Sequence, residues 1–117
     1  MKESIGRDRY PDGSYIFRVV GVPEKVFTRS GKPQRVWILK SSEGKDFMFW
    51  LFPNKYQDIV LALGGEKVKG KVEWDDEQVS GKMFSCELKT VVSGDFENYV
   101  FNDCKPIADA DVEGIPF

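Results

Sequence analysis

Apolar and polar residues alternate along much of the chain with the two-residue period of β-strands, and segments rich in Gly and Pro separate these stretches. Pro23 weakens the first strand, and the pattern predicts that residues 26–28 resume it beyond a bulge. Helical spacing occurs once, after Asn54, which can act as N-cap, and it ends at Gly64-Gly65. The pattern predicts strands at 15–22, 34–40, 47–52, 67–74 and 83–92, a helix at 54–63, and a further short strand at 96–101.

The turn between the second and third strands decides which side chains share a face of the sheet. A two-residue turn at Glu43-Gly44 is favoured, because glycine tolerates positive φ. This register places Trp37 opposite Trp50, with Arg35 opposite Phe52 and Leu39 opposite Met48 on the same face. A longer, asymmetric loop would shift it. The opposite face is the better candidate for the core and holds Val36, Ile38, Phe47, Phe49 and Leu51.

The order of the elements predicts a mainly β fold. Three strands, a short helix and two further strands form the arrangement of the OB-fold, a five-stranded, partly open Greek-key barrel. We therefore expect an OB-type nucleic-acid-binding domain at 1–102, with one helix between the third and fourth strands. Residues 103–117 are expected to form a flexible acidic tail.

Charge also divides the chain, a few residues before this boundary. Residues 1–94 contain 16 Lys/Arg and 13 Asp/Glu, whereas residues 95–117 contain one Lys and six Asp/Glu. A mildly basic body with an acidic end is typical of proteins with an interaction tail. No apolar run approaches the roughly 20 residues that cross a bilayer, and the N-terminus has no hydrophobic signal segment, so we expect a cytoplasmic protein without membrane association.

Aromatic and basic residues gather on the second and third strands and on the loop that precedes them. Flat rings beside cations are what unpaired bases and their phosphates require. If the two indoles do not contact ligand, Phe47 and Phe49 are the alternative platform. The residues predicted to contact single-stranded nucleic acid are Trp37, Trp50, Phe52, Phe27, Tyr15, Arg29, Lys32, Arg35 and Lys40.

The C-terminal nine residues carry the most specific motif, in which spaced acids precede a terminal Ile-Pro-Phe. Acids keep such a peptide solvated and steer it to basic partners, while the final ring supplies an apolar anchor. The motif resembles the C-terminal tip of bacterial single-stranded DNA-binding proteins. The resemblance implies recruitment of replication, recombination and repair proteins by Asp109, Asp111, Glu113, Ile115, Pro116 and Phe117.

The motif departs from that family in two respects. Ala110, Val112 and Gly114 interrupt the acids, and no long Gly/Gln/Pro-rich linker precedes the tip, which shortens its reach. A divergent phage or plasmid version fits these departures. The resemblance further implies that the tip competes with DNA for the basic face.

The sequence therefore predicts a non-catalytic protein that coats single-stranded DNA with little sequence preference. DNA and RNA stay open as ligands, as does a homo-oligomer formed through an edge strand such as 67–74. With no histidine and two cysteines, no cofactor or metal site is expected. One alternative is an OB module for protein interaction or oligomerisation without nucleic-acid binding. Another is a metal-dependent hydrolase using Asp75, Asp76 and Glu77.

Overall fold

The computed structural model describes residues 10–94 and 96–107 of the 117-residue chain. This part is mainly β, with one helix, and contains no helix long and apolar enough to cross a membrane. The elements are β1 (Gly13–Val19), β2 (Glu24–Phe27), β3 (Pro33–Ser41), β4 (Asp46–Leu51), α1 (Pro53–Ala62), β5 (Glu66–Val68), β6 (Lys71–Glu73), β7 (Met83–Ser93) and β8 (Phe96–Pro106).

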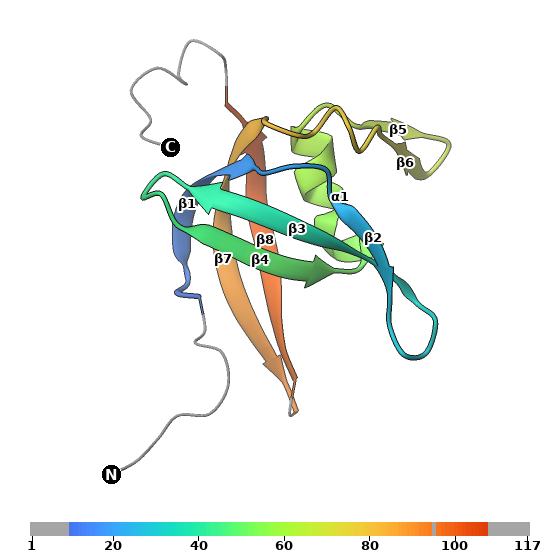
Figure 1. The fold of residues 1–117 in the computed structure, drawn as a ribbon, viewed down its shortest axis with the longest axis horizontal. Coiled ribbons are helices and arrows are strands. Elements are labelled where there is room, and N and C mark those ends of the chain that lie inside the picture. Colours follow the sequence, from blue (N-terminus) through green and yellow to red (C-terminus); the bar gives the residue numbers. More distant parts are fainter. Residues whose placement is uncertain (1–9, 95, 108–117) are drawn as a thin grey trace.

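Strand β3 is the centre of the main sheet. Both β1 and β2 pair with one edge of β3: Val19 opposes Leu39 in its second half, and Glu24 opposes Val36 in its first half. The predicted interruption of the first strand near Pro23 is therefore confirmed. β4 pairs with β3, and β1 continues the sheet to β7 and then β8. As Figure 1 shows, the β3–β4 hairpin consequently lies across β7 and β8 as a second layer.

The turn between β3 and β4 has three residues and not the predicted two. The Ser41 amide donates to the Lys45 carbonyl at 2.8 Å, and the Gly44 amide donates to the Ser41 carbonyl at 2.9 Å. Gly44 adopts a φ of 83°, the left-handed conformation that ends such a turn. The predicted register is therefore wrong by one residue: Trp37 opposes Phe49, and Val36 opposes Trp50.

Aromatic and aliphatic side chains fill the space between the two layers. Phe49 makes edge-to-face contacts with Phe101 and Tyr99 of β8, at centroid distances of 5.0 and 5.2 Å. The helix covers one end of this core with Ile59 and Val60, as its spacing predicted. Its first helical residue is Pro53, and Phe52 occupies the N-cap without a side-chain hydrogen bond, so the predicted Asn54 cap is wrong.

Among the described residues, no backbone pairing joins β4 to β8, so the sheet does not close. Tyr10, which precedes β1, bridges this gap, called the seam from here on. Its ring stacks on Phe47 with centroids 4.3 Å apart. Its hydroxyl accepts a hydrogen bond from the Met48 amide at 3.1 Å, and its own amide donates to the Tyr99 hydroxyl at 3.0 Å. One tyrosine therefore connects the two strands that backbone hydrogen bonds leave apart.

The predicted elements differ from the structure most in the second half of the chain. The expected strand at 67–74 is a hairpin, β5–β6, because Lys69 and Gly70 both have positive φ and reverse the chain in a two-residue turn. β8 runs through Pro106 and not only to residue 101, so Cys104 lies in the sheet and not in the tail. The expected lysine-bearing edge strand is therefore split between two short antiparallel strands.

Replacing Tyr10 should loosen the seam in a graded way. Tyr10→Phe removes only the acceptor of the Met48 amide and should cost about 0.5–1 kcal/mol of unfolding free energy. Tyr10→Ala also removes the ring stacked on Phe47 and should cost about 2 kcal/mol. Urea unfolding measures both, and hydrogen exchange at the Met48 amide should accelerate. Equal stability of Tyr10→Ala and the unmodified chain would contradict the bridging role.

Candidate nucleic-acid interface

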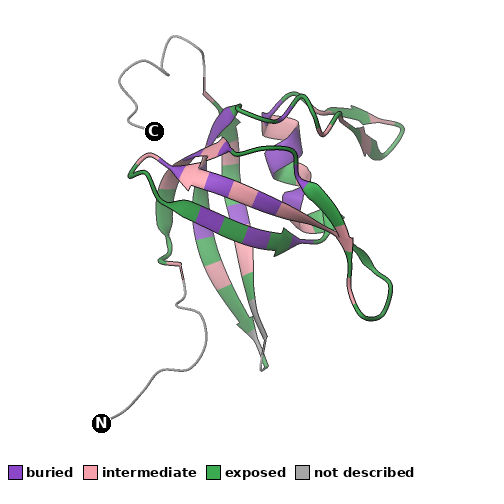
Figure 2. Ribbon diagram, in the orientation of Figure 1, coloured by how far each residue is buried: buried purple, intermediate pink, exposed green. Residues whose placement is uncertain are grey.

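Apolar side chains line the solvent side of the β3–β4 hairpin. Burial alternates along β4, where Phe47, Phe49 and Leu51 face the core, and the residues between them face outward (Figure 2). Directly opposed residues share a face, so Val36 and Ile38 accompany the outward residues of β4. We call this surface the outer face: Val36, Ile38, Met48 and Trp50, with Phe52 just beyond β4. The exposed fractions of its three largest side chains are 36% for Met48, 47% for Trp50 and 37% for Phe52.

Trp37 does not belong to this surface, contrary to the prediction. Its exposed fraction is 0%, because the three-residue turn places it on the core side of β3. There it stacks on Trp74 at 5.9 Å between centroids and contacts Tyr56 at 5.5 Å. The alternative platform, Phe47 and Phe49, is also buried. Of the predicted rings on β3 and β4, Trp50 and Phe52 are the ones exposed to solvent.

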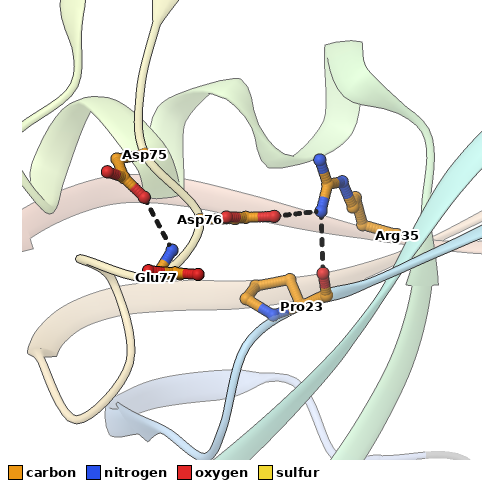
Figure 3. Close-up of polar contacts among 5 residues, drawn as sticks. All are labelled: Pro23, Arg35, Asp75, Asp76 and Glu77. Atoms are coloured by element: carbon orange, nitrogen blue, oxygen red, sulfur yellow. Dashed lines mark hydrogen bonds and ion pairs between the residues drawn. The ribbon is translucent and has the colours of Figure 1, made fainter.

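Arg35 is engaged within the protein. Figure 3 shows its guanidinium between two acceptors, the Asp76 carboxylate at 2.8 Å and the Pro23 carbonyl at 2.9 Å. The group also lies over the Trp74 ring, 5.1 Å from its centroid. Arg35 points to the core side of the sheet, as Trp37 does, because side chains two apart share a face. It therefore fastens the loop after β6 to β2 and β3 and is not placed beside Trp50.

Two other predicted rings also lie away from the outer face. Phe27 on β2 is 64% exposed, but its register with Pro33 places it on the same side as Arg35, beneath the Lys25 ammonium at 5.7 Å. Tyr15 lies half-buried against Phe17, and its hydroxyl donates to the Pro11 carbonyl at 2.7 Å. Burial, followed by the nearby Glu43 and Asp12 carboxylates, raises the pKa of Tyr15 above its ordinary value.

Cations border the outer face on two sides. Lys40 lies on it, opposite Arg18 of β1 on one side and Asp46 of β4 on the other. Arg29 and Lys32 are exposed in the turn between β2 and β3. This turn repeats the geometry of the β3–β4 turn: the Thr28 amide donates to Lys32, the Gly31 amide donates to Thr28, and Gly31 has a φ of 81°. Of these three predicted cations, Arg29 and Lys32 are exposed, and Lys40 is half-buried opposite Asp46.

A groove of about 220 Å³ opens where the outer face meets the seam. Met48, Trp50 and Phe52 form one wall, and Tyr10 and Tyr99 lie at the bridge between the strands. Besides the two tyrosines, its polar lining residues are Gln34 of β3, Lys55 of α1 and Asn98 of β8. The sequence analysis singled out none of these three. A three-residue turn would have placed Gln34 beside Phe52, but nothing in the sequence indicated that β8 brings Asn98 to the same groove.

Two of the three carboxylates proposed for a metal-dependent hydrolase make contacts within the fold. Asp75 accepts a hydrogen bond from the Glu77 amide at 2.9 Å, and Asp76 pairs with Arg35 (Figure 3). Within the described residues, no group of three or more His, Cys, Asp or Glu side chains is placed to hold a metal ion. The predicted tail residues Asp109, Asp111, Glu113, Ile115, Pro116 and Phe117 lie outside the described part of the chain.

Comparison with protein-family models and with curated protein sequences finds no match to this chain.

Both cysteines are free thiols in the β7–β8 layer, where Cys86 is buried and Cys104 half-buried. Burial, with a smaller contribution from Cys104, raises the pKa of Cys86 to about 12. Burial, together with the nearby Asp58 and Asp103 carboxylates, raises the pKa of Cys104 to about 12. The thiolate is the reactive form, so neither group is suited to nucleophilic or redox chemistry near neutral pH.

These thiols should make the fold sensitive to alkali. A raised pKa in the folded state means that the unfolded chain loses its thiol protons first, so stability should fall as pH rises from about 9 to about 12. Urea unfolding at several pH values measures this loss, which should be smaller in Cys104→Ala. Iodoacetamide at about pH 8 should modify both thiols far more slowly than a free cysteine. Rapid modification of the folded protein would contradict the burial of these groups.

Proposed function

We propose that the chain binds single-stranded nucleic acid on the outer face, with Trp50 and Phe52 as stacking platforms. The observation that supports this most directly is the row of large apolar side chains, Met48, Trp50 and Phe52, that β4 and the following residue turn toward solvent. Large exposed apolar surface on a small protein marks a binding surface more often than an isolated side chain does. The proposal concerns binding and includes no catalytic step.

The surroundings of this row favour a nucleic-acid strand as the ligand. Unpaired bases offer flat faces that stack on aromatic rings, and phosphates require nearby cations. Lys40 shares the outer face, Lys55 lines the groove next to Phe52, and Arg29 and Lys32 stand in the turn at the end of the hairpin. A strand that follows the hairpin would meet rings and cations together. Single-stranded DNA is the ligand proposed, with RNA as the comparison in the test.

The order of the strands supports an open form of the OB-fold as the scaffold. β1 and β2 together occupy the place of its first strand, β3 and β4 follow, α1 comes next, and β7 and β8 complete the set. In OB-folds the second and third strands form the ligand surface, and here β3 and β4 hold those places. We interpret the seam as the point at which such a barrel would close and Tyr10 as its bridge.

The residues beyond the described part complete the proposal. Asp109, Asp111 and Glu113 with the terminal Ile-Pro-Phe are suited to recruit basic partner proteins of DNA replication, recombination and repair, as the resemblance of this tip to those of bacterial single-stranded DNA-binding proteins implies. In the alternative, the outer face contacts protein instead of nucleic acid. That alternative predicts burial of Trp50 in a complex and no response to oligonucleotides.

The first test is titration with oligo-dT and with the matching RNA, followed by tryptophan fluorescence. Trp50→Ala should weaken binding by about 5- to 150-fold, which corresponds to about 1–3 kcal/mol for one stacked base. Affinity should also fall as salt rises, because cations hold the phosphates. Phe27→Ala is the matched control, since this exposed ring lies on the opposite side of the sheet, and it should change the affinity less than about twofold.

Two results would contradict the proposal. One is the absence of salt-sensitive binding to any single strand. The other is an equal loss of affinity in Trp50→Ala and Phe27→Ala, which would place the ligand away from the outer face. Self-association that Trp50→Ala abolishes, without any oligonucleotide binding, would favour the protein-interaction alternative.

The acidic tail should compete with DNA at low salt. Deleting residues 109–117 removes three acids and leaves 17 Lys/Arg against 16 Asp/Glu, so the net charge changes from −2 to +1. Oligo-dT binding at low salt should then become several-fold tighter, and the difference should vanish at high salt. Deleting only Ile115, Pro116 and Phe117 keeps the acids and should leave low-salt affinity unchanged. Equal affinity of both deletions and the full chain would contradict the competition.

A further inference from the structure

The groove at the seam combines features that stacking alone does not require. Two residues with carboxamide side chains line it from different strands, Gln34 from β3 and Asn98 from β8. Trp50, Phe52 and Lys55 line the same groove. Among the described residues that line the groove, none is an acid, so an anionic ligand meets a cation there without carboxylate repulsion.

Carboxamides are suited to the edge of a nucleobase. Each places a donor beside an acceptor, and bases expose the same neighbouring pair on their edges. In single strands those edges are open to side chains, while the faces of the base stack on rings. A nucleotide held here would present its face to Trp50 or Phe52, its edge to the amides and its phosphate to Lys55.

From this combination we propose that the groove is a base-reading pocket for one unpaired nucleotide of the bound strand. The inference rests on the proposed function and deepens it, because it gives the protein a preference among bases where the sequence predicted little. Adenine is the base expected to bind best, since a carboxamide matches its amino group and ring nitrogen with two hydrogen bonds. Reading from both sides of the seam also requires Tyr10 and Tyr99 to hold β4 and β8 at a fixed separation.

The test compares oligo-dA, oligo-dC and oligo-dT of about ten nucleotides, a length within the usual site size of single-strand binders. The unmodified protein should bind oligo-dA at least about fivefold more tightly than the weakest of the three, and a preference for another base would contradict the adenine assignment. Asn98→Leu and Gln34→Leu should each reduce the spread, which is the ratio of the tightest to the weakest affinity among the three oligonucleotides, to about twofold. The affinity for the weakest oligonucleotide should not change. Asn102→Leu is the matched control, because Asn102 is exposed on β8 outside the groove, and its spread should equal that of the unmodified protein.

A second measurement does not depend on variants. In ¹⁵N-labelled protein, the side-chain amide signals of Gln34 and Asn98 should shift on addition of deoxyadenosine monophosphate, while that of Asn102 should not. Equal binding of all three oligonucleotides, or an unchanged spread in both groove variants, would overturn the base-reading pocket and leave the proposed function intact. Failure of all three to bind would overturn the proposed function itself, and this inference with it.

Discussion

The length of one turn determines which surface this protein presents to solvent. Gly44, with its φ of 83°, closes a three-residue turn between β3 and β4, and the turn fixes the register of the hairpin. Because successive side chains in a strand point to opposite faces, that register turns Trp37 inward and Trp50 outward. A turn shorter by one residue would exchange the two faces of β4 relative to β3. The turn therefore determines both which side chains form the core and which form the candidate interface, although the turn itself belongs to neither.

The second organising feature is the seam. β1 is shared between two layers, so the sheet bends back on itself, but among the described residues β4 and β8 remain without backbone pairing. Rings take the place of a hydrogen-bond ladder there: Tyr10 stacks on Phe47, and Phe49 contacts Tyr99. Ring contacts hold the two strands together where backbone pairing is absent, and the same gap contains a groove. The seam between β4 and β8, which keeps the sheet open, is thus also the place where the groove of the candidate interface lies.

The sequence predicted most of the element order, the helix and the break in the first strand, because periodicity and Gly/Pro placement report local geometry. It failed where one residue of turn length decided the outcome, as at Trp37, and where partners far apart in the chain decided it. Arg35 was predicted to bind phosphate, but its guanidinium pairs with Asp76, which lies 41 positions later in the chain. Asn98 and Lys55 could not be identified, because their place in the groove depends on how β8 and α1 pack.

The three indoles also occupy three different environments. Trp37 is sealed in the core, Trp74 is half-buried beneath a guanidinium, and Trp50 stands in solvent. Indole emission moves to longer wavelength as water gains access, so the protein's fluorescence contains components that can be separated by colour. A dissolved quencher such as iodide reaches Trp50 first and leaves Trp37 almost untouched. Without any added label, Trp37 therefore reports on the core, Trp74 on the surroundings of the Arg35–Asp76 ion pair, and Trp50 on the candidate ligand surface.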